Sequence, residues 1–332
     1  MNTHPAIPAV SILARSPNLD AAAIETVVTL PTFRRPEHLL RTLDSLVSQE
    51  GAPPFAVIVM ENDDEGRAGA SACLPMFESR HVGGVLVVAH ERGNCSAYNA
   101  GWATALRCFP TLKRLVVIDD DEIAEPTWLA RMVGAETRLG VDIVGGPQVP
   151  VFAHEADARL ARHPVFAPPY VATQRVPALY SSGNLLVTAR VLAAMPQPHL
   201  DTRFNFLGGG DSDFLSRAAA RGFRLGWCAE ARVMETVPSR RTEGDWIRAR
   251  AIRNGVISTL VERRKRQDQA LGRLIVAGRS LALLAMSPLR GIPLAFKTGL
   301  ASAYPYPGLV AAGRLMAEFG YMNEQYREPE KN

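Results

Sequence analysis

Two groups of acidic residues follow directly on short apolar runs. Asp119–Asp121 follow Leu115–Ile118, and Glu61–Asp64 follow Ala56–Met60. Carboxylates held close together repel one another unless a cation, a basic side chain or a helix N-terminus offsets their charge. Carboxylate oxygens are also preferred ligands of hard divalent cations. The first group in particular therefore predicts a site for a divalent cation.

The same acids also have a simpler interpretation, in which they end strands and cap the helices that follow. For Glu61–Asp64 the sequence does not distinguish the two interpretations. For the three aspartates the metal site is favoured, because they stand together directly after an apolar strand. Alternation along a strand would turn Asp119 and Asp121 to one side and Asp120 to the other, so the outer pair are the predicted ligands.

A third acidic segment follows a run of glycines. Asp211 and Asp213 come after Gly208–Gly210, whose conformational freedom allows a tight turn and the close approach of a second substrate. An apolar pattern predicts a helix that begins near Asp213 and directs its N-terminal amides toward this turn. Asp211 and Asp213 are also residue types that a helix N-cap and a first helical turn favour.

The elements that must position these acids follow from the apolar patterns between Thr26 and Gly146. Short β-rich runs alternate there with helical patterns, which predicts a doubly wound α/β fold with a parallel sheet. The predicted strands are Thr26–Leu30, Ala56–Met60, Val85–Ala89, Leu115–Ile118 and Val141–Val144. Helices are predicted for Pro36–Val47, for Ala97–Cys108 and from Pro126 onward. Ligands bind beyond the carboxyl ends of the strands in such sheets.

The order of the motifs resembles that of family 2 glycosyltransferases with the GT-A fold. The sequence has neither GxxxxGK[ST] nor a GxGxxG after the first predicted strand, so a nucleotide would bind without either loop. The segments that carry the resemblance are Thr29–Arg35, Val57–Asp63, Gly93-Asn94 with Tyr98–Gly101, Asp119–Asp121 at the place of the D-x-D motif, Ser182–Leu186, and Phe206–Phe214 at the place of the catalytic-base motif.

The resemblance implies a Rossmann-like, mostly parallel sheet with covering helices and a helical C-terminal extension. It implies an inverting transfer of sugar from a nucleotide-diphosphate sugar to a saccharide or lipid-linked acceptor, with Mg²⁺ or Mn²⁺ on the donor diphosphate and Asp211 as general base. The implied donor-binding residues are Pro31, Thr32, Phe33, Arg35, Glu61, Asp63, Asn99, Asp119, Asp120, Arg250 and Arg253. The implied acceptor-side residues are Asn184, Gly209, Gly210, Asp213 and Trp246. The implied metal ligands are Asp119, Asp121 and Glu235.

The sequence departs from the family's motifs at four positions. Arg34 stands where Asn is usual and Tyr98 where Arg is common. Gly210 stands where Glu is frequent, and Glu235 where many relatives have His. These departures keep open a second hypothesis, in which the chain binds a nucleotide-sugar or a carbohydrate without turnover. A third hypothesis, a nucleotidyltransferase, would require a Gly-rich basic loop that the sequence lacks.

Length and composition exclude several other classes of protein. With 332 residues, 47% of them hydrophobic and 21% charged, the chain is neither disordered nor fibrous. Its four cysteines form no CxxC pair, which argues against a disulfide framework and favours a reducing, cytoplasmic compartment. Residues 1–25 lack the basic start of a secretory signal and are predicted to be a lead-in to a domain at 26–255 and an extension at 256–332. Nothing indicates a nucleic-acid partner.

Positive charge is concentrated near the C-terminus. Arg240–Lys297 contain thirteen basic and four acidic residues, a net +9, so the rest of a chain with net charge +4 carries −5. The cluster Arg263–Arg266 precedes short apolar helical runs broken by Pro288 and Pro293. This pattern predicts docking on an anionic membrane surface, peripherally on the cytoplasmic face of the inner membrane. Packing of the same runs against the catalytic domain, or a homodimer interface, is the alternative.

Overall fold

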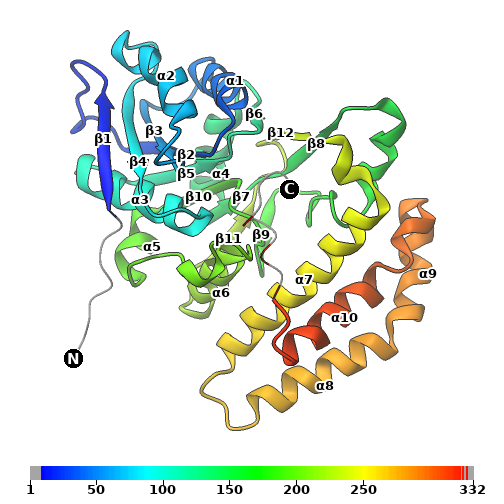
Figure 1. Cartoon of the computed structure of the whole chain (residues 1–332). Helices are drawn as coiled ribbons and strands as arrows, with labels where there is room; N and C mark the ends of the chain where they lie inside the picture. The colour runs from blue at the N-terminus through cyan, green and yellow to red at the C-terminus, as the bar shows by residue number, and fades with distance from the viewer. Residues whose placement is uncertain (1–8, 323, 325–326, 328–332) are drawn as a thin grey trace. The chain divides into compact units, whose positions relative to one another are not determined.

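The computed structural model describes residues 9–322, 324 and 327 (Figure 1). The chain forms two compact units, the first made of Met1–Gln148 and Tyr170–Glu235 and the second of Val149–Pro169 and Thr236–Asn332. These limits differ from the predicted boundaries after residues 25 and 255. A strand lies within the predicted lead-in, and the helix Gly244–Lys265 runs unbroken through residue 255.

A nine-stranded sheet forms the centre of the first unit. The strands of the chain are β1 Val10–Arg15, β2 Thr26–Thr32, β3 Phe55–Glu61, β4 Gly84–Ala89, β5 Arg114–Ile118, β6 Glu122–Ala124, β7 Ile143–Gly145, β8 Gln148–Phe152, β9 Gln174–Val176, β10 Asn184–Thr188, β11 Leu225–Trp227 and β12 Val233–Val237. The order in the large sheet is β1-β4-β3-β2-β5-β10-β7-β11-β9, and a small sheet has the order β6-β12-β8. β2, β3, β4 and β5 run parallel, so their carboxyl ends share one edge.

The prediction of a mostly parallel sheet did not include two antiparallel strands. β10 runs antiparallel to β5 and to β7. β1 pairs antiparallel with β4 inside the predicted lead-in. β1 is an edge strand with mostly exposed side chains, including Ile12 and Leu13, so its sequence shows no alternation of buried and exposed positions.

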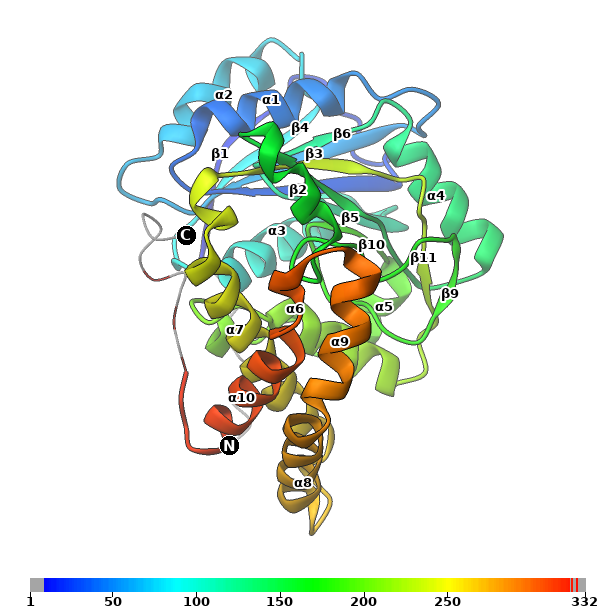
Figure 2. The ribbon, with the colours of Figure 1, turned by 90° about the vertical axis from the view of Figure 1, so that its right-hand side faces the viewer.

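Helices cover both faces of the sheet (Figure 2). The helices of the first unit are α1 Pro36–Val47, α2 Ala68–Glu78, α3 Asn94–Cys108, α4 Trp128–Leu139, α5 Ala189–Ala194 and α6 Gly210–Ala220. α1, α2 and α4 bury Leu39, Phe77 and Trp128 in one core against the sheet. α3 lies on the opposite face, where a Cβ on Gly101 would be only 2.5 Å from Sδ of Met60. α2 was not predicted, because it contains a proline and has no marked apolar stripe.

The second unit is mainly helical. Its helices are α7 Gly244–Lys265, α8 Gly272–Ala285, α9 Ser287–Thr298 and α10 Tyr306–Glu318. α10 packs against the other three helices. It approaches α7 closely at two glycines, since a Cβ on Gly255 or Gly313 would lie 2.0 Å from a backbone oxygen of the other helix. Arg314 is buried at this junction and donates hydrogen bonds to Ser258, Ser280 and Glu262.

Candidate active site

At the carboxyl ends of β2 and β5, Asp120 and Asp121 contact a threonine and an arginine. Thr32, the last residue of β2, donates its hydroxyl to Oδ2 of Asp120 at 2.9 Å. Nη1 of Arg35 lies 2.9 Å from Oδ2 of Asp121 and 3.4 Å from Oδ1 of Asp120. β5 ends at Ile118, so strand alternation does not extend to these acids. Asp120 and Asp121 therefore share one arginine instead of pointing to opposite sides.

Asp119 has different partners. The hydroxyl of Tyr98 donates a hydrogen bond to Oδ1 of Asp119, and the backbone N–H of Asp119 donates to Oε2 of Glu122 at 2.9 Å. Burial, followed by the negative charge of Asp121, raises the pKa of Asp119 to about 7. Burial also raises the pKa of Asp120 to about 7. The acids disfavour one another's charged form, a condition that a bound cation relieves.

Two glutamates extend this acidic cluster. Glu122 begins β6 and lies directly opposite Glu235 in the antiparallel pair of β6 and β12. Burial, followed by the charge of Asp119, raises the pKa of Glu122 well above its ordinary value, and the charge of Glu235 acts in the same direction. Nε2 of Gln148 donates to Oε1 of Glu122 at 2.6 Å. Glu122 was not among the predicted site residues, although its place three residues after Asp119 was a signal.

The chemistry of these donors fits a divalent cation. The predicted ligands Asp119, Asp121 and Glu235 belong to one acidic cluster, in which the charges of the last two raise the pKa of the first. Within the part of the chain that the structure describes, no three His, Cys, Asp or Glu side chains are arranged to hold a metal ion. Mg²⁺ is commonly held by one or two carboxylates together with substrate phosphates and water. The cluster can supply such a partial ligand set.

The end of β3 carries two predicted donor-binding acids with different contacts. Glu61 is fully buried, and its two carboxylate oxygens accept the backbone N–H groups of Asp63 and Ala70, each at 2.9 Å. Its carboxylate thus anchors the first turn of α2. Asp63 is held instead by Arg34, whose Nε lies 2.7 Å from Oδ2. This ion pair holds the pKa of Asp63 below its usual range.

An aromatic and cationic surface lies beside Asp63. The guanidinium groups of Arg34 and Arg92 lie 4.9 and 5.0 Å from the ring centre of Phe33, and Arg92 also lies 5.8 Å from that of Phe206. Arg34 adopts a φ of 57°, which is uncommon for a residue with a side chain. Arginine forks bind phosphate oxygens, and aromatic rings stack on planar groups. Arg34 and Arg92 were not predicted as site residues.

Asp211 lies in the first turn of α6, with its carboxylate held by two backbone donors. Oδ1 accepts the N–H of Ser212 at 2.7 Å, and Oδ2 accepts the N–H of Ser182 at 3.2 Å. The side chain is only half-buried. Gly210 precedes it where a larger side chain has no room, because a Cβ there would lie 2.3 Å from Sγ of Cys95. The carboxylate is therefore oriented by the backbone and remains accessible.

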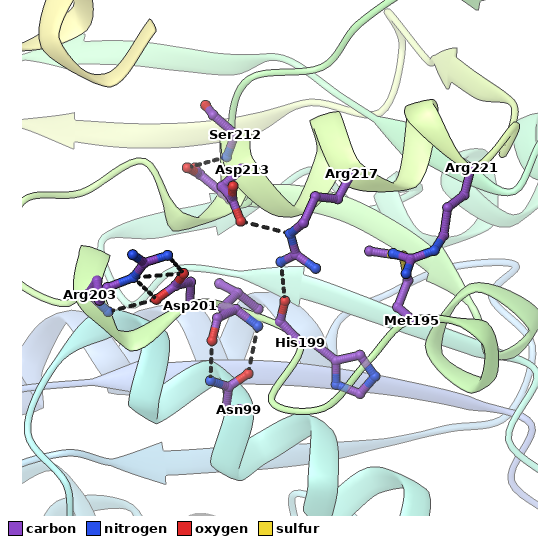
Figure 3. A network of polar contacts seen from close by, with 11 residues as sticks. Asn99, Met195, His199, Asp201, Arg203, Ser212, Asp213, Arg217 and Arg221 are labelled. Carbon is purple, nitrogen blue, oxygen red and sulfur yellow. Dashed lines mark hydrogen bonds and ion pairs between the residues drawn. The ribbon is translucent and has the colours of Figure 1, made fainter. Parts of the chain in front are cut away.

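Asp213, two residues after Asp211, faces the protein interior (Figure 3). It is 1% exposed, and its Oδ2 accepts a hydrogen bond from Nε of Arg217 at 2.8 Å. Arg217 in turn donates to the carbonyl oxygen of His199 at 2.5 Å. Gly209, which precedes the helix, has a φ of 92° that favours glycine. These contacts tie α6 to the preceding segment, while the predicted acceptor-side role of Asp213 and Gly209 stays a prediction.

Two predicted asparagines also use their side chains inside the protein. Asn99 donates to and accepts from the backbone of Leu200, at 2.8 and 2.9 Å (Figure 3). Asn184 accepts the indole N–H of Trp128 and donates to two backbone carbonyls. Pro31 lies within β2, one residue before its end. These contacts point to structural roles, and direct contacts of these residues with substrate stay a prediction.

Three predicted residues belong to the second unit. Trp246, Arg250 and Arg253 all lie in α7. The indole of Trp246 stacks on Phe166 with ring centres 6.2 Å apart, and the guanidinium of Arg241 lies 5.8 Å from the Trp246 ring. Arg253 is buried. Their part in binding donor or acceptor stays a prediction.

Comparisons with known proteins identify the family of the chain. The family model described as "Glycosyltransferase like family 2" matches residues 24–254. The succinoglycan biosynthesis protein ExoM of Rhizobium meliloti is 28% identical over 232 residues, which cover 68% of this chain and 71% of ExoM.

Two solved structures are similar in fold. One is the mannosyltransferase PcManGT from Pyrobaculum calidifontis, in complex with GDP-Man and Mn²⁺, with a TM-score of 0.53, 19% identity, and coverage of 91% of this chain and 89% of that chain. The other is residues 1–349 of S. aureus TarS in complex with UDP, with a TM-score of 0.51, 12% identity, and coverage of 90% and 92%.

Proposed function

We propose a specific reaction for this chain, which belongs to the glycosyltransferase-like family 2 and is a glycosyltransferase. The predicted family, GT-A fold and enzyme class are thereby confirmed. The family uses a nucleotide-sugar as donor. The proposal is that the sugar passes to a saccharide or lipid-linked acceptor in one displacement, with inversion at the anomeric carbon.

The position of Asp211 carries this proposal. Its carboxylate is half-buried and is oriented by the N–H groups of Ser182 and Ser212. The neighbouring acid Asp213 is buried and forms an ion pair with Arg217. Asp211 is therefore the acid in this turn that can reach an acceptor. It takes the proton of the acceptor hydroxyl as the oxygen attacks the anomeric carbon, which is general base catalysis. Attack from the side opposite the departing diphosphate inverts the centre.

The acidic cluster is the proposed place of Mg²⁺ or Mn²⁺. Asp119 and Asp121 would hold the ion, and Glu235 is close enough to add its charge. When bound, such an ion offsets the charge that develops on the departing diphosphate. Arg35 holds Asp120 and Asp121 in place and adds positive charge at the same edge of the sheet. Tyr98 fixes the orientation of the Asp119 carboxylate.

The surface made by Phe33, Arg34, Asp63 and Arg92 is the proposed place of the donor nucleotide. The carboxylate of Asp63 can accept hydrogen bonds from a nucleotide base. The guanidinium groups of Arg34 and Arg92 can each donate two parallel hydrogen bonds to phosphate oxygens. Because Arg34 already pairs with Asp63, nucleotide binding at this surface would compete with or extend that ion pair.

The acceptor is proposed from the likeness to ExoM, which is named for succinoglycan biosynthesis. A growing saccharide, free or linked to lipid, is the matching class of acceptor. The proposed location is the cytoplasm, with peripheral attachment to the inner face of the membrane where such lipid-linked saccharides are assembled.

A panel of nucleotide-sugars tests the proposed function. Each donor is added with Mg²⁺ or Mn²⁺, and thermal stabilisation and diphosphate release are measured. We expect one donor class to raise the melting temperature, because binding to the native state stabilises it by mass action. We also expect slow diphosphate release with that donor. Stabilisation without any release, even with saccharide acceptors present, would favour the non-catalytic binding protein instead.

A further inference from the structure

Helix α8 carries apolar residues on two opposite faces. At about 100° per residue, Gly272, Val276 and Ser280 lie on one side and are buried in the helical unit. The opposite side spans about 120° of the helix and holds no charged residue. Its members are Leu271, which precedes the helix, and Leu274, Ile275, Gly278, Leu281, Ala282 and Ala285, all exposed.

Helix α9 repeats this arrangement after a bend of 58°. Gly291 and Thr298 are buried on its packed side. Leu289, Ile292 and Phe296 lie on the outward side, and Phe296 is 84% exposed. The outward face of α8 and α9 is defined here by the exposed members of α8 together with Leu289, Ile292 and Phe296. A soluble surface seldom leaves so large an apolar stripe uncovered.

Within the helical unit the outward face is turned away from the packing core. α10 packs against α7, α8 and α9, and Figure 1 shows α8 and α9 as the outer helices of this unit. Val276 and Ser280 are fully buried, and Arg314 of α10 donates a hydrogen bond to the hydroxyl of Ser280. The inward side of α8 therefore accounts for the packing of the unit, and the outward face needs another covering.

The charge of this segment indicates what covers it. Between Asp268 and Glu318 the sequence contains five basic residues and no acidic one. Arg279 pairs with Glu262 of α7, and Arg314 is buried. The other three, Arg273, Arg290 and Lys297, are exposed along the flanks of the outward face. An apolar stripe bordered by cations matches the boundary between the acyl chains and the headgroups of anionic lipids.

We propose that the outward face of α8 and α9 docks on the surface of a membrane that contains anionic lipids and lies in its interface. A symmetric dimer through the same face would set these cations against one another with no acidic partner in the segment, which disfavours a second copy. No single described helix is long and apolar enough to cross a membrane. Together α8 and α9 have the length and the apolar composition of a membrane span, but the pair is bent by 58°. This docking does not depend on the proposed sugar transfer.

Vesicle flotation of the full-length protein, without donor or acceptor, tests the docking. Phosphatidylcholine vesicles are compared with vesicles that also contain phosphatidylglycerol, at low and at high salt. We expect flotation with the anionic vesicles and its loss at high salt, because salt screens the attraction to the headgroups. Equal flotation with both kinds of vesicle, or none with either, would overturn the proposal.

Two sets of substitutions separate the apolar from the ionic contribution. Leu274→Ser, Leu281→Ser and Phe296→Ser together remove outward side chains without touching the packed side, and we expect binding to fall about a hundredfold. Arg290→Gln with Lys297→Gln should weaken binding to anionic vesicles about twenty-five-fold, at about fivefold per cation. If the apolar variant binds as the parent does, the outward face is not the docking surface.

A matched control and a local probe complete the experiment. Val171→Ser removes a side chain that is 90% exposed in the first unit and should leave flotation unchanged. With Cys108→Ser as background, an environment-sensitive fluorophore on Phe296→Cys should shift to the blue on anionic vesicles, and the same label on Val171→Cys should not. No shift at position 296 would overturn the proposal. The proposal would also be overturned by a parent protein that binds no vesicles but forms a concentration-dependent dimer, if the apolar triple variant abolishes that dimer.

Discussion

Asn184 is a residue for which a structural role and a predicted contact with the acceptor can be told apart by experiment. The side chain is 2% exposed and makes three hydrogen bonds inside the first unit. Its Oδ1 accepts the indole N–H of Trp128 at 2.9 Å, and its Nδ2 donates to the carbonyl oxygens of Pro147 and Ala231 at 3.0 and 2.8 Å. The amide thereby joins β10 to α4, to the residue before β8 and to the segment before β12.

The substitution Asn184→Leu keeps the volume and removes all three hydrogen bonds. The buried indole N–H of Trp128 and the buried carbonyl of Ala231 would lose this partner, whereas the carbonyl of Pro147 keeps the N–H of Val233 at 3.1 Å. At about 1–3 kcal/mol for each of two unsatisfied groups, the expected loss in the free energy of unfolding is about 2–6 kcal/mol. Such a loss is a large part of the total stability of a domain, about 5–15 kcal/mol. We therefore expect a strongly destabilised protein.

Urea unfolding followed by circular dichroism measures this loss. The partner variant is Trp128→Phe, which removes the donor to Asn184 and also part of a fully buried ring, and the double variant separates the coupling between the two side chains from that loss of packing. We expect the coupling to be about 1 kcal/mol. A change in stability below about 1 kcal/mol for Asn184→Leu, combined with a raised KM for the acceptor, would refute the structural role and support the contact that the sequence motif suggests.

Three further predictions follow from the site and its surroundings. Asp121→Ala should weaken Mn²⁺ and donor binding in calorimetry and abolish transfer, and full activity in excess chelator would contradict the metal proposal. Tyr98→Phe should weaken Mn²⁺ binding about tenfold, because Asp119 loses the hydrogen bond that orients it; unchanged affinity would remove Tyr98 from the site. Burial lowers the pKa of His199, so the unfolded chain binds its proton first as the pH falls. The contribution of His199 to the free energy of unfolding should therefore decline below about pH 6.5, and the difference between the parent and His199→Gln across that pH separates it from the opposite contribution of the buried acids.

Local patterns in the sequence were sufficient for the elements that bury one clear apolar stripe or run. α1 has the predicted bounds, and β3 extends the predicted run Ala56–Met60 by one residue at each end. α2 and β1 were missed for the same reason, since neither presents such a pattern. The antiparallel course of β10 depends on which strands it joins, and a sequence pattern does not contain that information.

In the site, the residue types were predictable and their pairings were not. The aspartates after β5 and the turn at Asp211 stand in the sequence as recognisable segments. Arg34 and Asp63, which are 29 residues apart, and Arg35 and Asp121, which are 86 apart, meet only because β2, β3 and β5 end at one edge of the sheet. The inward turn of Asp213 is likewise set by Arg217, one helical turn further on.

The rate of sugar transfer by Asp211→Asn tests the central claim most directly. Asn keeps the size of the side chain and can still accept the N–H of Ser212 or Ser182, but it cannot take a proton from the acceptor. With the donor found by the panel, the account predicts transfer that is about 10²- to 10⁴-fold slower while donor affinity, measured by calorimetry, is nearly unchanged. A variant that keeps more than about half of the parent rate would contradict Asp211 as the general base.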